Sequence, residues 1–355
     1  MTRIGRLSVV VSVVALVSPG AGVPAEELSF RDECPQSKAF IETAEAHLKD
    51  TPKLSYYDAS KGLVVARSDA AAAPCSWLTF QVPVSSEKGV GPDAGHFTIF
   101  CGQYLVCDGE KINQIRPGGQ VVRRNSREVG NYNTIILDGL APWEAPDPGY
   151  RPGAIVALKD YPEGLYVAAD LAGPWGGKAK TLTRQIVFLR PDILVVYDRV
   201  VASEKMSMSW CLNLMESPGV AGKVMTVTSR ITGNGLYCLT LLPEDTVAMR
   251  PRLGERGGGV SSIPGWRMER QSRDLLSETN FLHVLYFGRV RPGEDDKPFP
   301  IDLLREASQE GARITRREAV AEILFSKTGP PSGRMTVKNK QGPTVREFAA
   351  TVEAP

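Results

Sequence analysis

Histidine is the scarcest residue type of functional interest in this chain of 355 residues. The sequence holds only three, His47, His96 and His283, and they stand far apart. Zinc sites are built chiefly from histidine and cysteine at short, regular spacings, and the six cysteines show no such spacing. A metal-dependent hydrolase is therefore poorly supported, and the sequence predicts neither a metal site nor a cofactor.

Long hydrophobic runs are also lacking beyond the N-terminus. The chain begins with two arginines, an apolar run over residues 7–17 and small residues at 23–25. This order is typical of a secretory signal with cleavage near residue 25, and the run is short for a membrane span. We therefore predict a secreted or periplasmic chain without a membrane span after cleavage. The alternative is an uncleaved anchor.

Without the predicted signal, the chain has no net charge. Removal of the signal takes two of the 42 basic residues and none of the 40 acidic residues, so the two counts become equal. A nucleic-acid-binding protein needs a basic face, and the neutral balance argues against such a partner. An acidic sugar is not excluded, because one local basic patch is enough to attract it.

The pattern of apolar residues predicts an all-β fold. One helix is expected from about Gln36 to Lys49, where apolar residues recur at helical spacing. From Leu63 onward, period-two apolar runs alternate with Pro, Gly and Asn. Many short antiparallel strands in one chain predict a large antiparallel β-sandwich with a short N-terminal helical arm.

The predicted boundaries follow from these patterns. We expect a signal over residues 1–25, a helical arm over 26–60 and the sandwich domain over 61–355. Hairpin turns are predicted at residues 161–164, 190–192 and 233–235, where Pro, Gly or Asn interrupt strand patterns. A short helix is predicted over 302–311. Cys101, Cys107, Cys211 and Cys238 lie inside apolar runs and are interpreted as buried small hydrophobes.

One hairpin, from Gly91 to Gly109, provides the main candidate site, with the sequence GPDAGHFTIFCGQYLVCDG. HFTIF is predicted as a strand, Gly102-Gln103 as a turn, and YLVCDG as the returning strand. Polar groups flank both strands. Such groups lie at the rim of a sheet, where ligands can reach them.

This hairpin and the stretch RSDAAAAPCSWLTFQV before it resemble the β-rich domain of heparinase II/III-like polysaccharide lyases. In that family R-S-D and a strand precede H-x-H-x-D-x-G-S-F, a second strand and a closing D-x-G. The later stretches NYNTIILDG, RQIVFLRPDILVVYDRV, GLYCLTLLPED and NFLHVLYFG resemble further family motifs. The likeness runs from Arg67 to Gly288, and its specificity lies in the order of the motifs.

The resemblance implies cleavage of uronic-acid polysaccharides by β-elimination. That chemistry needs a neutralised sugar carboxylate, a base and an acid. In the family the site lies between this domain and an N-terminal helical toroid. The stretch before Arg67 has room for one helix, so an active enzyme would need a separate helical-toroid chain as its partner.

The sequence departs from the family at the metal-binding motif. Both histidines of H-x-H-x-D are glycine here, at Gly89 and Gly91. The family's structural zinc ligands would align with Gly91, Asp108 and Tyr132. One carboxylate does not make a zinc site, so we predict no zinc at this position.

The resemblance also suggests which residues carry catalysis. His96 and Tyr132 are the candidate catalytic residues, because histidine or tyrosine serves as the base in such lyases. Each has a structural alternative: His96 as a hydrogen-bonded sheet histidine and Tyr132 as strand packing.

Four further residues are candidates for binding the substrate. Asp93 and Asn133 flank the strand starts, and Arg123 and Arg124 lie in the basic stretch RPGGQVVRRNSR. Guanidinium groups pair bidentately with carboxylate or sulfate. The alternatives are a turn for Asp93 and a solvated loop for the arginines.

Two functions stay open on the sequence. The first is an exported heparinase II/III-like protein that acts on or binds an acidic polysaccharide, by resemblance a uronate lyase. The alternative is a non-catalytic glycan-binding or scaffold sandwich descended from such a lyase. The absent histidines and toroid favour the second, whereas the order of motifs supports relationship rather than activity.

Overall fold

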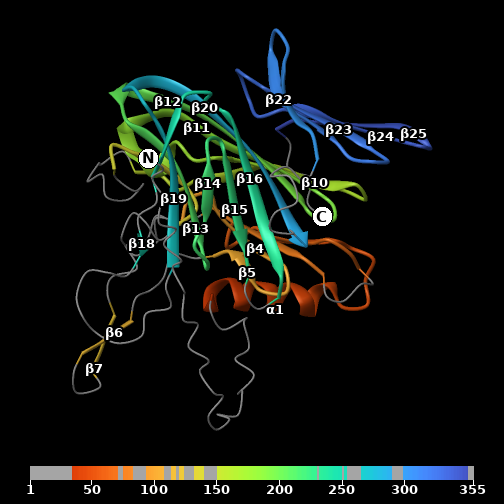
Figure 1. The fold of residues 1–355 in the computed structure, drawn as a ribbon, viewed down its shortest axis with the longest axis horizontal. Coiled ribbons are helices and arrows are strands. Elements are labelled where there is room, and N and C mark those ends of the chain that lie inside the picture. The colour runs from red at the N-terminus through yellow and green to blue at the C-terminus, as the bar shows by residue number, and fades with distance from the viewer. Residues whose placement is uncertain are drawn as a thin grey trace, which may run out of the picture.

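The described part of the protein is built in four layers. The computed structural model describes residues 34–70, 75–82, 93–107, 113–116, 120–123, 132–139, 150–229, 232–249, 252–253, 265–289 and 299–350. Helix α1 (Pro35–Leu48) lies against the first of three antiparallel sheets, and the other two sheets follow in succession (Figure 1). The predicted large antiparallel β-sandwich with a short helical arm is confirmed, with a third sheet added.

The first sheet includes the central hairpin. Its strands follow the spatial order β1 (Ser55–Asp58), β2 (Leu63–Arg67), β3 (Trp77–Gln81), β4 (His96–Phe100), β5 (Tyr104–Val106), β13 (Met208–Leu214), β19 (Gly265–Ser272) and β17 (Thr246–Met249). In addition, β8 (Ile135–Leu137) pairs with β13, and β18 (Arg252–Leu253) pairs with β19.

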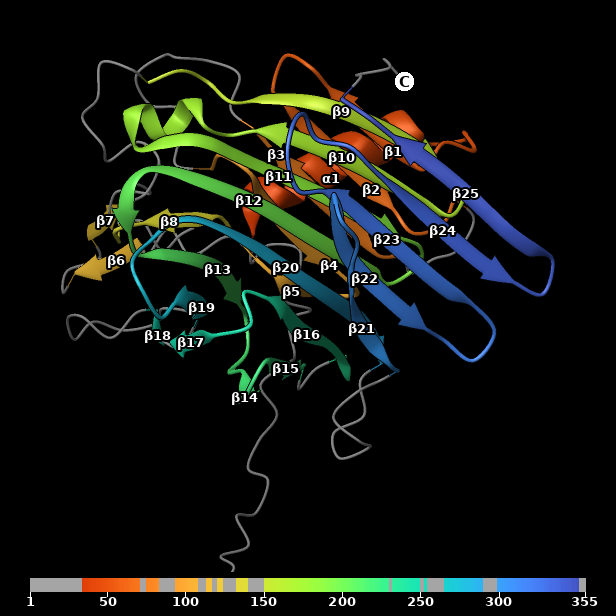
Figure 2. The ribbon, with the colours of Figure 1, turned by 90° about the horizontal axis from the view of Figure 1, so that it is seen from above.

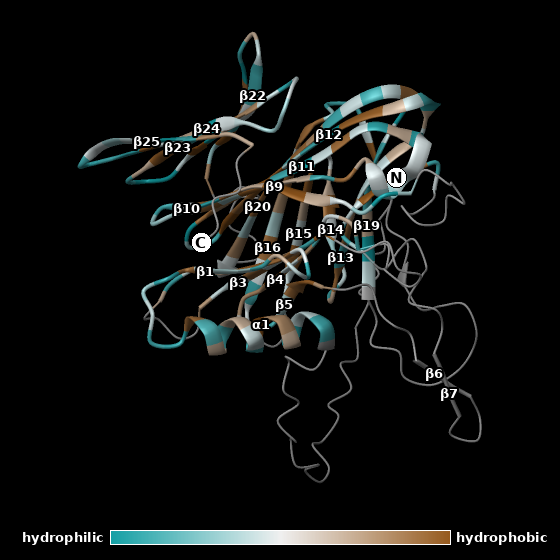
Figure 3. Cartoon of the chain, turned by 180° about the vertical axis from the view of Figure 1, so that it is seen from behind, coloured by the Kyte–Doolittle hydropathy of each residue, from teal (hydrophilic) through white to brown (hydrophobic). Residues whose placement is uncertain are grey.

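The second sheet faces the first and is built largely from long strands. Its order is β14 (Gly219–Ala221), β15 (Val224–Thr228), β16 (Asn234–Leu242), β20 (Leu276–Arg289), β12 (Ile193–Met206), β11 (Ala179–Leu189), β10 (Gly164–Asp170) and β9 (Ala154–Tyr161). A short 3-10 helix, η3 (Gly173–Lys178), joins β10 to β11. Figure 3 shows the hydrophobic colour along many of these strands.

The third sheet packs on the outer face of the second, and Figure 2 shows it in blue, lying across part of that sheet. Its order is β21 (Ile301–Arg305), β22 (Gln309–Thr315), β23 (Val320–Ser326), β24 (Gly333–Asn339) and β25 (Gly342–Phe348). A separate two-stranded ribbon is formed by β6 (Asn113–Arg116) and β7 (Gln120–Arg123).

Strand β2 is covered on both faces, which explains why its first four residues, Leu63 to Ala66, are all apolar. All five residues of LVVAR are buried. Val64 and Ala66 point into the core between the first and second sheets, whereas Leu63 and Val65 pack under α1. A strand covered on both faces needs apolar side chains on both. This packing places α1 on the outside of the first sheet.

The predicted helix and two of the hairpin turns are confirmed. Helix α1 lies within one residue of the predicted bounds. Tyr161 pairs with Gly164 across one turn, and Leu189 pairs with Ile193 across another. The central hairpin is also confirmed, because β4 covers HFTIF and β5 begins after the Gly102-Gln103 turn.

The helix predicted over 302–311 is wrong. Strands β21 and β22 occupy this stretch, and Leu303 pairs with Ala312. Both residues join the apolar cluster between the second and third sheets. Burial of one face of a strand pair therefore outweighs the local helix-forming tendency.

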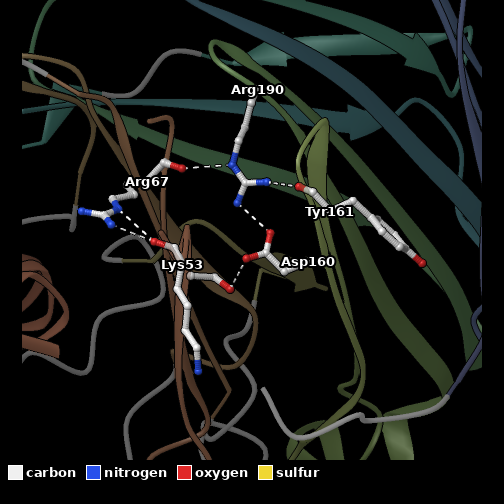
Figure 4. A network of polar contacts seen from close by, with 6 residues as sticks. Lys53, Arg67, Asp160, Tyr161 and Arg190 are labelled. Carbon is white, nitrogen blue, oxygen red and sulfur yellow. Dashed lines mark hydrogen bonds and ion pairs between the residues drawn. The ribbon is translucent and has the colours of Figure 1, made fainter. Parts of the chain in front are cut away.

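A polar network ties the helical arm to the second sheet (Figure 4). The Arg190 guanidinium donates to the main-chain oxygen of Arg67 at 3.1 Å, that of Tyr161 at 2.5 Å, and Asp160 Oδ1 at 2.7 Å. Ser55 of β1 donates to the other Asp160 oxygen at 2.6 Å. Arg67 itself donates to the Lys53 carbonyl at 2.8 Å. These contacts fix the edge formed by β1 and β2 against β9.

The proposed signal lies outside the described residues. Within the described part of the chain, no helix combines the length and apolar character that crossing a bilayer requires. The cysteine interpretation is confirmed for Cys107, Cys211 and Cys238, which are buried, while Cys101 is half-buried.

Candidate functional site

A tight turn forms the entrance of the central hairpin. The His96 N–H donates to the Asp93 carbonyl at 2.9 Å, which closes the turn. Gly95 has φ +77, and a Cβ added there would lie 2.5 Å from Leu171 Cδ1. Glycine alone satisfies both the backbone angle and the close approach. The turn therefore fixes where Asp93 and His96 stand.

The structure brings the two candidate catalytic residues together. The His96 and Tyr132 rings meet edge to face with their centroids 5.3 Å apart. His96 Nδ1 accepts the backbone N–H of Asn133 at 2.9 Å. In a neutral ring this leaves the proton on Nε2, so His96 can donate a hydrogen bond from that atom. Its side chain is only 4% exposed, whereas Tyr132 is half-buried.

Asn133 is fully buried, and its side chain bonds to three backbone groups. The amide nitrogen donates to the carbonyls of Phe97 at 2.6 Å and Cys107 at 3.0 Å. The amide oxygen accepts the N–H of Asn213 at 2.6 Å. Asn133 therefore joins both strands of the hairpin to β13, and a sugar could not reach this amide without displacing them.

Thr134 strengthens the same junction. Its hydroxyl donates to the Ala94 carbonyl at 2.7 Å, and its carbonyl accepts the N–H of Cys211 at 3.0 Å. Residues 132–134 thus clamp the hairpin entrance against β13. The hairpin entrance is therefore held in place by hydrogen bonds to the backbone of two neighbouring segments.

Arg184, on strand β11 of the second sheet, binds this junction from the opposite sheet. Its Nη1 donates to the Gly95 carbonyl at 2.5 Å and to the Asn133 carbonyl at 2.6 Å. Its Nε and Nη2 bind the two Asp198 oxygens at 2.6 and 2.9 Å. The sequence reasoning singled out neither residue, although both are charges placed within apolar strand runs.

A second tyrosine, Tyr150, belongs to the rim and was also missed. Burial and then the negative charge of Asp93 raise the pKa of the Tyr150 phenol. Asp93 is itself buried, at 7% exposure. Tyr150 precedes β9 in a stretch without strand or helix periodicity, so pattern reasoning had no signal for it.

The predicted arginines cannot be placed at the rim. Arg123 ends β7, of which only the backbone is described, and Arg124 lies outside the described residues. Gly91 and Asp108, two of the aligned zinc positions, also lie outside. Among the residues that the structure does describe, no three His, Cys, Asp or Glu side chains are grouped to hold a metal. The absence of zinc stays a prediction.

The remaining histidines have structural surroundings. His283 is fully buried, stacks on Trp210 with the ring centroids 3.7 Å apart, and lies 3.2 Å from the Thr240 hydroxyl. It is a core histidine. His47 stacks on Tyr56 at 4.6 Å, on the helical arm and away from the hairpin entrance.

Sequence comparison finds no relatives. No protein-family model matches this chain, and no curated protein sequence matches it significantly. Any relationship therefore rests on the fold.

Comparison with solved structures identifies the fold. Heparan sulfate lyase HepC from Pedobacter heparinus superposes with a TM-score of 0.60 at 13% identity, over 92% of this chain and 48% of that one. A heparinase III gene product gives 0.59 at 14% identity, over 90% and 47%. Another heparinase III gives 0.57 at 11% identity, over 84% and 43%. The chain spans about half the length of these proteins, and it has the β-sandwich fold of the heparinase III lyases.

Proposed function

We propose that this chain is an exported domain that binds an acidic polysaccharide at the rim of its first sheet. The rim consists of Asp93, His96, Tyr132 and Tyr150. The observation that carries the proposal is the contact between Tyr132 and His96 at the hairpin entrance, in a fold shared with heparan sulfate lyases. Phenol and imidazole groups offer both hydrogen bonds and ring faces to a sugar.

Binding is favoured over catalysis by the hydrogen bonds of the site. His96 Nδ1 is occupied by the Asn133 N–H, so a neutral His96 presents a donor rather than a base. The Asn133 amide is occupied by three backbone groups. Asn133 is therefore proposed to position the rim, while Arg123 and Arg124 are proposed to attract the anionic chain.

A uronate lyase is the second candidate, and the Tyr132–His96 pair favours it. In that reading Tyr132 would take the proton beside the sugar carboxylate, and His96 Nε2 would hydrogen-bond to the substrate. A separate helical-toroid chain would supply the remaining partners. Without that chain the rim would bind weakly and turn over slowly.

The test combines affinity with product detection. The protein is titrated with heparan sulfate, heparin, chondroitin sulfate and alginate by calorimetry, and ultraviolet absorbance reports any unsaturated uronate. Tyr132→Phe and His96→Gln should weaken binding, whereas Tyr57→Phe, on the edge strand β1, is the matched control. Loss of product formation in Tyr132→Phe would support the lyase. Unchanged affinity in both rim variants would refute the proposed site.

Export has its own test. N-terminal sequencing of the protein recovered from the cell envelope or medium should begin near residue 26. Recovery of the whole chain from the cytoplasm would contradict export without bearing on glycan binding.

A further inference from the structure

A pocket of about 310 Å³ opens at one end of the second sheet. The segment before β9, the end of β10, helix η3 and the start of β11 form its walls. Three of its residues carry charge: Arg151, Asp170 and Lys180. In Figure 2, η3 is the short green coil at one end of the second sheet.

The pocket has an excess of positive charge. Arg151 and Lys180 are exposed, and neither side chain forms an ion pair with any residue that the structure describes. Asp170 Oδ1 accepts the N–H of Ala172 at 3.0 Å. The pocket thus holds one carboxylate, already bonded to the backbone, and two exposed cations whose polar ends are available to a ligand.

Backbone contacts hold the walls in place before any ligand arrives. The Arg151 N–H donates to the Gly173 carbonyl at 3.1 Å, and the Trp175 N–H donates to the Ala172 carbonyl at 3.1 Å. A Cβ at Gly173 would lie 2.7 Å from the Arg151 oxygen, so the two segments are in close contact. Trp175 is 1% exposed and anchors η3 in the core. A preformed wall lowers the ordering cost of binding.

Two pocket residues, Arg151 and Asp170, are each followed or preceded in the chain by a residue that lies close to the hairpin entrance. Tyr150, next to Arg151, lies near enough to Asp93 for that charge to raise the pKa of its phenol. Leu171, next to Asp170, approaches Gly95 so closely that a Cβ there would clash with it. The two surfaces are therefore neighbours, and one extended ligand can span both.

We propose that Arg151 and Lys180 form an anion subsite for a carboxylate or sulfate group of an acidic glycan whose adjoining sugar lies on the rim. This inference rests on the proposed function. The guanidinium offers a planar fork to an anion, and the ammonium offers a compact charge with rotatable donors. Asp170 opposes the anion and limits the affinity of the subsite.

The experiment measures affinity for heparan sulfate and alginate oligosaccharides by calorimetry at two salt concentrations. Arg151→Ala and Lys180→Ala should each weaken binding on the order of tenfold at low salt, with a smaller loss at high salt. Asp170→Asn should tighten binding, because it removes the opposing charge and can still accept the Ala172 N–H. Arg317→Ala and Lys53→Ala are the matched controls, since both residues are exposed and neither lines the pocket.

The outcomes separate this inference from the proposed function. If rim variants weaken binding and the pocket variants behave like the controls, the subsite is refuted and the rim stands. If the pocket variants alone weaken binding, an anion site at Arg151 and Lys180 stands, whereas the rim, and with it a ligand that spans both, is refuted. If the unaltered protein binds none of these glycans, both fail. Alginate carries only carboxylates, so a loss seen with heparan sulfate alone would assign the subsite to sulfate.

Discussion

Arg184 of β11 and Asp198 of β12 face each other across adjacent strands and form a two-point ion pair in the interior of the sandwich. Both side chains are 0% exposed. Burial raises the pKa of the Asp198 carboxyl, and Arg184 opposes that rise. The same guanidinium holds the carbonyls of Gly95 and Asn133. The pair thus connects the second sheet to the rim of the first.

Removing one partner of this pair should destabilise the fold strongly. Arg184→Leu leaves a buried carboxylate and two carbonyls without their donors, so we expect a loss of about 3–5 kcal/mol in the free energy of unfolding. Urea denaturation followed by fluorescence measures it. Arg313→Ala, in the exposed pair with Glu322, is the control and should change stability by less than about 1 kcal/mol. A double variant Arg184→Leu with Asp198→Leu should cost less than the two single losses combined.

Asn133 should prove to be a positioning residue. Asn133→Ala strands the carbonyls of Phe97 and Cys107 and the N–H of Asn213, and each buried unpaired group costs about 1–3 kcal/mol. We expect a loss of about 3 kcal/mol or more in thermal or urea unfolding. A stable Asn133→Ala variant with weakened glycan binding would instead show that the amide contacts the sugar directly.

The strand pattern was visible in the sequence because its cause is local. HFTIF forms β4 as predicted, and the turns near Pro162 and Pro191 fall where Pro and Gly interrupt the pattern. The second of these turns also contained an unused signal. With Leu189 opposite Ile193, the register of an antiparallel hairpin places residue 184 opposite residue 198, so the ion pair could have been predicted.

The rest of the site depends on contacts between distant segments. Asn133 accepts a hydrogen bond from the N–H of Asn213, and the charge of Asp93 raises the pKa of Tyr150. Local periodicity in the sequence indicates neither of these contacts between distant segments. The misplaced helix near residue 302 has the same origin, because Leu303 packs against the cluster between the second and third sheets rather than against its own neighbours in the chain. Long-range packing overrides propensity in such stretches.

The polar network around Arg190 should govern how firmly the helical arm is held. Arg190→Ala removes donors to two carbonyls and to Asp160, and we expect a loss of about 2–4 kcal/mol because three hydrogen bonds from a side chain that is only 5% exposed are lost together. Limited proteolysis should then cleave the arm faster. Arg273→Ala is the matched control, since its pair with Asp245 is 63% and 70% exposed. Equal proteolysis rates in both variants would show that the apolar contacts of α1 hold the arm alone.

His283 should make the fold sensitive to acid. Burial, with smaller effects from Arg270 and Arg184, holds the pKa of its imidazole well below the usual value. The folded chain therefore keeps His283 neutral, while the unfolded chain takes up a proton below about pH 6.5. Stability from this residue is present above that pH and is lost as the pH falls, by up to about 1.4 kcal/mol per pH unit.

Urea denaturation between pH 7.5 and pH 5 tests this expectation. His283→Gln should lower the free energy of unfolding at neutral pH. The variant should also take up about one proton fewer on unfolding, so its free energy of unfolding should fall less steeply as the pH is lowered. His47→Gln, at an exposed position, is the control and should keep the steep dependence. Parallel curves for the unaltered protein and His283→Gln would contradict the assignment. They would mean that other ionisable groups, rather than this histidine, set the acid response.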